Sequence, residues 1–225
     1  MTDYCEWLEG REKRISGTYF SSFLGLFCIA YQYALMHRMK LQVTVDTISL
    51  YVTRADKKIP LIFVLDEITM EECPYVEEEQ VNSWRKEALI QFYSEIITPL
   101  LQSAAQSAGL PNGQLWGQIA TRMYNVHDRL LREADSEEER QTLLECLDLL
   151  RDEISAEVFG RTRNPFLIRF TWLDDPLKPG EKMRRKASCC QAYLRFDTCN
   201  YCYSCPKITK EQREEKRLEK IRKNS

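Results

Sequence analysis

The chain has 225 residues, of which 44% are hydrophobic and 29% charged, and its formal net charge is −2. This is the composition of an ordinary soluble protein long enough for one domain with a small appendage, and its eight Gly and eight Pro exclude a collagen-like segment or a long linker. A net charge this close to zero argues against a globally basic protein that binds nucleic acid.

The first predicted element is a long helix over 15–39. It contains twenty successive uncharged residues, 17–36, which is long enough to span a bilayer. Its serines, glycines and tyrosines, together with Gln32, favour a buried core helix, so we expect no integral membrane insertion. The charged N-terminus before it lacks the apolar core of a secretory signal.

A small antiparallel hairpin or sheet is predicted next. Apolar and polar residues alternate over 41–45, and the alternation resumes out of phase over 48–52, as a bulge or break would cause. Residues 54–58 (RADKK) are expected to connect these strands to a short buried strand over 59–65. The acidic stretch 66–79 is predicted to be a solvated loop.

Three helices are predicted in the middle of the chain, so that the fold class is α+β and mostly helical. Pro99 should kink or divide the first helix, the sequence SEEE at 136–139 forms a capping box at the start of the third, and Gly160 ends it. A strand-like segment, 166–172, follows. The apolar stripes comprise Trp84, Ala88, Phe92, Ile96 and Leu100, then Leu115, Ile119, Met123, Val126 and Leu130, then Leu143, Leu147, Leu150, Ile154 and Val158.

The C-terminal part of the chain is basic. Eight Lys and Arg face three Asp and Glu over 161–186, and eight face four over 207–225, so the rest of the chain is acidic. We divide the chain into an α+β helical body (1–160), a strand followed by a cysteine-rich segment (161–206), and a charged tail (207–225). The tail is expected to be a solvated helix or to fray.

Five of the nine cysteines fall within seventeen residues, and the absence of a secretory signal favours a reducing compartment. Cys202 and Cys205 form a C-x2-C pair, which can hold one metal centre from a tight turn, and Cys189 and Cys190 are adjacent. Four thiolates suit a [2Fe–2S] cluster. Adjacent side chains of an extended chain point to opposite sides, and a two-iron cluster, which is larger than a single ion, can be bound by both. By count, four thiolates suit zinc as well. C-x2-C also occurs in thiol–disulfide pairs, although no thioredoxin-like context surrounds this one.

The pattern CC…YCYSCPK resembles the C-terminal signature of the FhuF-type ferric siderophore reductases, cytoplasmic [2Fe–2S] proteins with the motif C-C-x10-C-x2-C. The basic run RRK at 184–186, Tyr193, Tyr201 and Pro206 are similar too. Upstream, LWGQIA at 115–120 is similar to the family's L-x-G-N-x-A element. The resemblance is strong over roughly the last forty residues and faint elsewhere.

The spacing departs from the family pattern at one point. Eleven residues, not ten, separate Cys190 from Cys202, and Cys199 is an extra thiol among them. An alternative ligand set would use Cys199 with Cys202. We assign the cluster to Cys189, Cys190, Cys202 and Cys205, because Pro206 follows the last of these and the spacing is then off by one only. Cys199 is then a free thiol or a neighbour of the ligands.

The resemblance implies a cytoplasmic enzyme that releases siderophore iron by one-electron reduction of Fe(III) to Fe(II), with electrons from a ferredoxin- or flavin-type donor. Fe(II) binds hard anionic oxygens less strongly than Fe(III), so reduction frees the metal. Beyond the cluster ligands, no catalytic residue is predicted. Arg184, Arg185 and Lys186 are candidate contacts for an anionic iron complex or an acidic donor, and a solvated basic loop is the alternative.

Two other functions stay open. One is a non-enzymatic, zinc-stabilised binding module whose basic flanks contact an anionic partner. The other is an accessory protein of siderophore biosynthesis, although the chain lacks the P-loop pattern of a nucleotide-binding synthetase. His37 and His127 stand alone and are predicted to be surface or core residues. The aromatic residues expected to pack around the cluster are Tyr193, Phe196, Tyr201 and Tyr203.

Overall fold

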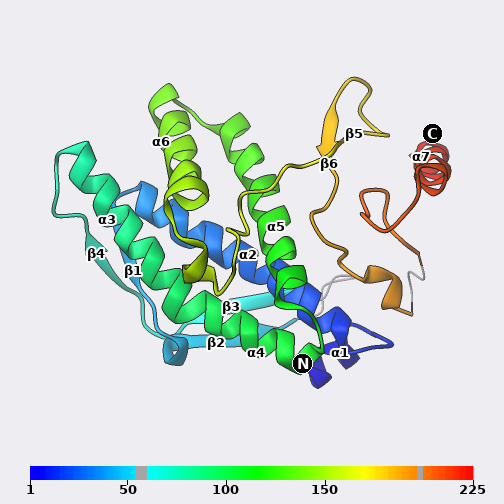
Figure 1. Cartoon of the computed structure of the whole chain (residues 1–225), viewed down its shortest axis with the longest axis horizontal. Helices are drawn as coiled ribbons and strands as arrows, with labels where there is room; N and C mark the ends of the chain where they lie inside the picture. The colour runs from blue at the N-terminus through cyan, green and yellow to red at the C-terminus, as the bar shows by residue number, and fades with distance from the viewer. Residues whose placement is uncertain (54–59, 197–199, 225) are drawn as a thin grey trace.

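The computed structural model describes residues 1–53, 60–196 and 200–224 and has the predicted α+β class (Figure 1). Its helices are α1 (Thr2–Trp7), α2 (Arg14–Met36), α3 (Glu78–Gln91), α4 (Thr98–Ala108), α5 (Asn112–Glu133), α6 (Glu137–Asp148) and α7 (Lys210–Asn224). Its strands are β1 (Met39–Gln42), β2 (Ile48–Val52), β3 (Leu61–Leu65), β4 (Thr69–Glu72), β5 (Trp172–Asp174) and β6 (Lys182–Arg184). The segments β5, β6 and α7 lie together on one side of α5, away from the β1–β4 region (Figure 1).

Helix α2 is the central helix of the core. It packs along α5 so closely that a Cβ atom on Gly25 would lie 3.1 Å from the Ile119 carbonyl oxygen. Within the part of the chain that the structure describes, it is the one helix long and apolar enough to cross a membrane, and 56% of its apolar window is buried against the rest of the protein. This is the buried core helix that the sequence predicts. It ends at Met36, earlier than expected, because Arg38 adopts a left-handed conformation and β1 begins at Met39.

The predicted small sheet is present as two separate antiparallel pairs, β2 with β3 and β1 with β4. The β2–β3 pair is the expected hairpin, whose connection at 54–58 lies outside the described residues. The prediction of a loop over 66–79 was wrong for β4. This exposed acidic strand pairs with β1, placing Glu71 opposite Lys40, and Gln42 Nε2 donates to the Glu71 carboxylate at 2.8 Å.

Pro99 divides the first predicted helix, as expected. A π-helical turn, η2 (Phe92–Ile97), ends α3, and Pro99 stands in the first turn of α4. Proline is favourable there because the first backbone N–H groups of a helix have no partner within the helix.

The third predicted helix begins as expected but ends too soon. Ser136 Oγ accepts a hydrogen bond from the Glu139 N–H at 3.0 Å, which confirms the N-terminal cap. A continuous helix to Gly160 was wrong, because the chain passes through the π-helical turn η3 (Leu149–Glu153) and restarts as the 3₁₀ turn η4 (Ala156–Phe159). Asn164 Nδ2 donates to the carbonyl oxygens of Leu150, Arg151 and Ile154 and so satisfies the end of η3.

The strand predicted over 166–172 was wrong except at its last residue. Residues 166–171 have no regular structure, and Trp172 begins β5, which pairs with β6. Tertiary contacts hold this segment against α5 instead, since Phe166 is fully buried and the Tyr124 hydroxyl donates to its carbonyl oxygen at 2.6 Å. The tail forms α7, which buries none of its residues and is therefore the solvated helix anticipated from its charge.

His127 is a buried residue of α5 whose Nε2 lies 2.8 Å from the Leu143 carbonyl oxygen. Burial lowers its pKa, Arg184 lowers it further, and the Leu143 carbonyl and Asp148 oppose this change. The unfolded chain therefore takes up the proton first, so this residue costs stability once the pH falls through the unfolded value of about 6.5, and has no such effect above it.

We expect His127→Gln to lose less stability than the wild type between about pH 7 and about pH 5, because the Gln side chain does not titrate and can still donate to the carbonyl. Urea unfolding at the two pH values measures the difference. An equal loss in both proteins would contradict this reading of His127.

Candidate metal centre and the adjoining pocket

Side chains of α5 hold the stretch that carries the first two cysteines. Gln118 Nε2 donates to the Ser188 carbonyl oxygen at 2.9 Å, and Ser188 Oγ donates to the Gln114 carbonyl oxygen at 2.7 Å. Gln114 Nε2 in turn donates to the Cys189 carbonyl oxygen at 3.1 Å. Gln114 and Gln118, which are one turn apart on α5, therefore fix the backbone carbonyl groups of Ser188 and Cys189 and the Ser188 hydroxyl.

Gly117 permits this close approach between α5 and the cysteine stretch. A Cβ atom at this position would lie 2.7 Å from Ser188 Oγ and 2.8 Å from Ser188 Cβ. The sequence element LWGQIA at 115–120 thus has a clear structural role, since its glycine and its Gln118 both contact Ser188. The motif that lies seventy residues upstream of the cysteines is part of their support.

Other segments complete the support of the cysteine pair. Thr18 Oγ1 of α2 donates to the Cys190 carbonyl oxygen at 2.8 Å, and the Ala187 N–H donates to Thr121 Oγ1 of α5 at 3.0 Å. The Lys186 N–H donates to the Ser204 carbonyl oxygen at 3.0 Å, which joins the two cysteine stretches directly.

The second cysteine stretch is a tight turn held by α7. The Cys205 N–H donates to the Cys202 carbonyl oxygen at 3.0 Å. The Arg213 guanidinium donates to the carbonyl oxygens of Tyr203, Cys205 and Ile208. A single arginine of the C-terminal helix therefore positions the C-x2-C turn.

The four predicted ligands lie together in the structure. Cys205 Sγ lies 3.6 Å from Cys189 Sγ, Cys202 is within hydrogen-bonding reach of both Cys190 and Cys205, and all four are free thiols. Each of the two adjacent cysteines thus faces one cysteine of the C-x2-C turn. Cys199, the extra thiol, lies outside the described residues.

Lysine side chains provide positive charge on both sides of the thiols. Lys186 Nζ lies 3.1 Å from Cys190 Sγ. Burial alone would lower the pKa of Lys186, but the Cys190 and Cys202 sulfurs outweigh burial and raise it. The hydrogen bond from Cys205 lowers the pKa of Cys189 to about 7, with Lys207 acting in the same direction. The thiolate, the form that binds metal, is therefore favoured at Cys189, whereas the hydrogen bond with Cys202 raises the pKa of Cys190 and the hydrogen bond to Cys189 raises that of Cys205.

Aromatic rings cover the more buried half of the cysteine group. Tyr193 and Tyr201, whose centroids are 4.5 Å apart, pack with Ile208 against Cys189 and Cys205. Two of the four predicted aromatic neighbours lie elsewhere. The Tyr203 hydroxyl donates to the Asp174 carbonyl oxygen, and Phe196 is 63% exposed.

The donor set suits a thiolate-bound metal group. The cysteines form two facing pairs, Cys189 with Cys205 and Cys190 with Cys202. Four thiolates in two pairs match the ligand count of a [2Fe–2S] cluster and also that of a zinc ion. In the described ranges, no three Cys, His, Asp or Glu side chains are already placed around a single ion position.

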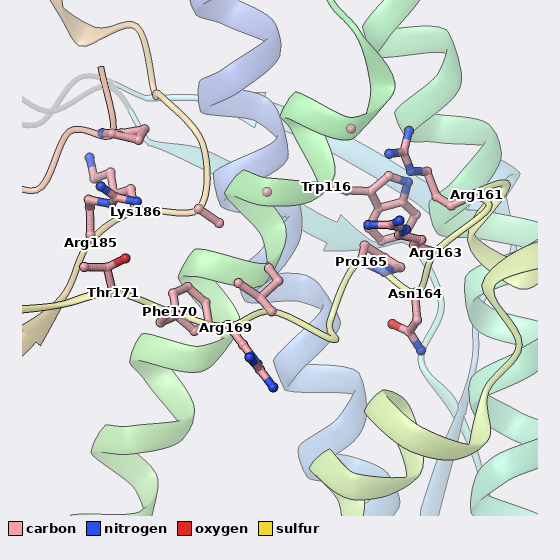
Figure 2. Close-up of a pocket in the computed structure, with 15 residues that line it drawn as sticks. Trp116, Arg161, Arg163, Asn164, Pro165, Arg169, Phe170, Thr171, Arg185 and Lys186 are labelled. Atoms are coloured by element: carbon pink, nitrogen blue, oxygen red, sulfur yellow. The ribbon is translucent and has the colours of Figure 1, made fainter. Parts of the chain in front are cut away.

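A basic pocket of about 310 Å³ adjoins the cysteine stretches (Figure 2). Arg161 and Arg163 lie on one side of it, Arg185 and Lys186 lie on the other, and α5 runs between them (Figure 2). Pro206, which directly follows Cys205, also lines it. A second hollow of about 290 Å³ reaches Cys190 between α2 and α5.

The structure separates the three basic residues predicted as substrate contacts. Arg185 and Lys186 line the basic pocket, whereas Arg184 does not. The Arg184 guanidinium is paired with Asp128 and lies over the rings of three aromatic residues, so its contacts are those of a packing residue. These rings belong to Tyr124, Phe170 and Trp172.

Sequence reasoning missed three basic residues of the pocket, Arg161, Arg163 and Arg169. The signal that points to them is the positive charge of 161–186, but charge alone does not show which of its arginines share one pocket.

Comparison with known proteins gives no relative. No family model matches the chain, and neither a curated protein nor a solved structure matches it.

Proposed function

We propose that this protein is a cytoplasmic ferric siderophore reductase that holds a [2Fe–2S] cluster on Cys189, Cys190, Cys202 and Cys205. The observation that carries the proposal is the convergence of these four free thiols from two short stretches of chain. The resemblance of the same stretches to the FhuF-type signature supports the identity of the cluster and the substrate class.

The residues around the thiols suit an electron-transfer site. Lys186 and Lys207 provide positive charge next to the sulfurs, which stabilises thiolates and raises the reduction potential of a bound centre. Cys190 and Cys202 are only partly buried, whereas Cys189 and Cys205 are buried, so one side of the group is open to a partner. The bonds from Gln114, Gln118 and Thr18 fix the stretch, which keeps rearrangement on electron transfer small.

A bound [2Fe–2S] cluster supplies one-electron chemistry, in which a ferredoxin- or flavin-type donor loses one electron and the Fe(III) of a siderophore gains it. The chain's own part is to place the iron complex beside the thiol group and to release Fe(II), which hard oxygen ligands hold less strongly. This step moves no proton, and the proposal assigns no general acid or base to it.

Metal analysis of protein purified without oxygen tests this proposal. We expect red-brown protein that contains iron and acid-labile sulfide in equal amounts, absorbs visible light and bleaches with dithionite. Adding a ferric siderophore to the reduced protein should restore the colour and release Fe(II) to a ferrous chelator, one iron per electron stored. Apoprotein treated identically is the control.

Two results would reject the proposal. Colourless protein with stoichiometric zinc would instead support a zinc-stabilised binding module. An iron–sulfur protein whose reduced form is not reoxidised by any ferric siderophore tested would show that the cluster serves another electron acceptor.

A further inference from the structure

The basic pocket contains arginine side chains without acidic partners. Arg161, Arg163, Arg169 and Arg185 form no ion pair within the described part of the chain, and the residues that line the pocket include Lys186 but no Asp or Glu. Arg184 shows the contrast, since it is adjacent in sequence yet paired with Asp128. Like charges gathered in a hollow repel one another, and a bound anion removes this cost.

The wall formed by α5 turns the N-terminal end of this helix toward the pocket. The Arg161 guanidinium lies against the first turn of α5, where a Cβ atom on Gly113 would be 2.8 Å from its Nη2. Pro111, the N-cap residue, provides no side-chain cap to that turn. The Gln114 N–H of this turn donates to the Pro111 carbonyl oxygen at 2.9 Å, and the helix dipole favours negative charge at this end of the helix.

Trp116 provides an independent sign that the pocket is built for a ligand. This residue lines the pocket and is 1% exposed, and its Nε1–H is buried without an acceptor among the residues that the structure describes. A buried donor left unpaired costs free energy, which an acceptor oxygen on a bound molecule would recover.

We propose that this pocket binds a small anionic chelate rich in carboxylate oxygens, and that the natural ligand is a carboxylate-type ferric siderophore. The identity of the metal rests on the proposed function, whereas the preference for an anion does not. The volume of about 310 Å³ suits a small molecule. Arginine forks match carboxylates in two-point hydrogen bonding.

The pocket is also placed for electron transfer to its ligand. Lys186 lines the pocket with part of its side chain and lies 3.1 Å from Cys190 Sγ with its Nζ, and Pro206 follows Cys205 directly. A chelate held by the arginines is therefore separated from the thiol group by the thickness of one stretch of chain.

Binding of gallium(III) citrate, measured by isothermal titration calorimetry with the intact protein, tests the assignment. Gallium(III) resembles Fe(III) in charge and size but takes no electron, so that binding is measured apart from reduction. We expect gallium citrate to bind, added salt to weaken it, and the cationic gallium complex of desferrioxamine B to bind at least tenfold less tightly.

Arg161→Gln and Arg163→Gln should each weaken gallium citrate binding about tenfold, as expected for one charge-assisted hydrogen bond. Arg163 is exposed, so its replacement leaves the fold intact and the result interpretable. Arg132→Gln, at the exposed end of α5, and Arg122→Gln, which lines the hollow beside Cys190, are matched controls that should bind as the wild type does.

Unchanged affinity in Arg163→Gln, or a loss confined to Arg122→Gln, would overturn the assignment. The assignment would also fail if Arg161→Gln and Arg163→Gln bound gallium citrate normally but were no longer reduced by an acidic electron-donor protein. The arginines would then serve to dock that protein. Citrate binding by a zinc-containing protein would reject the proposed function and leave the anion site standing. Reduction of ferric desferrioxamine by a protein that does not bind citrate would reject the anion site and leave the proposed function standing.

Discussion

Cys205→Ser is expected to abolish the visible absorbance of the anaerobically purified protein and to leave iron below the level of detection. Cys205 is 1% exposed and its Sγ lies 3.6 Å from Cys189 Sγ, so no other described thiol can replace it without moving the turn. A serine hydroxyl is also a far weaker ligand for iron at neutral pH than a thiolate. Because metal binding is coupled to folding, the variant should also melt at a lower temperature than the holoprotein.

Single serine variants at Cys189, Cys190 and Cys202 should lose the colour in the same way. Cys73→Ser provides the matched control, since Cys73 is a partly exposed cysteine beside β4, outside the cysteine stretches. Cys199→Ser should also keep the colour, which tests the assignment at the position where the sequence spacing is irregular. Loss of colour in Cys199→Ser with retention in Cys205→Ser would show that the ligand set is shifted toward Cys199.

Local chemistry explains the parts of the fold that could be predicted from sequence. Ser136 and Pro99 act on their own helical turns, as a cap and a break, and both act as expected. Gly160 adopts the left-handed conformation of a helix end, but it ends the 3₁₀ turn η4 and not the third helix. The alternating residues of β2 and the apolar run of β3 could likewise be predicted to pair, because the two strands are close together in the sequence. Such signals survive without knowledge of the tertiary structure.

The parts that failed depend on residues far away in the chain. Strand β4 has no apolar alternation, and it is held by pairing with β1, whose Gln42 side chain donates to the Glu71 carboxylate. The end of the third helix is set by Asn164, whose amide satisfies carbonyl groups ten or more residues earlier. Neither contact can be predicted from the periodicity of apolar residues.

The candidate site divides in the same way. The cysteine spacing predicted the four thiols that the structure brings together, because thiol pairs close in sequence converge readily. It could not predict the arginines opposite, which come from a separate segment, nor the different fates of neighbouring basic residues. Arg184 ends strand β6 and faces the aromatic rings, while Arg185 lies in the pocket, since successive side chains of extended backbone point to opposite sides.

Gly117→Ala is expected to remove most of the visible absorbance while leaving the helical content unchanged. The added methyl group would lie 2.7 Å from Ser188 Oγ, 2.8 Å from Ser188 Cβ and 3.4 Å from its backbone nitrogen, so the cysteine stretch must move away from α5. Overpacking of this kind costs about 1–3 kcal/mol, whereas alanine in place of glycine favours the helix by about 1 kcal/mol. The damage should therefore appear in cluster content more than in far-ultraviolet circular dichroism.

Gly113→Ala is the matched control, because its added methyl group would meet only the end of the flexible Arg161 side chain. It should keep the colour and the helical content. Combining Gly117→Ala with Ser188→Gly removes the two closest atoms and should restore part of the absorbance that Gly117→Ala loses, although the Ser188 hydrogen bond to Gln114 is then absent. Such recovery in a double-mutant cycle identifies a direct contact between α5 and the cysteine stretch. Full colour in Gly117→Ala, or additive losses in the double variant, would show that this contact does not hold the site.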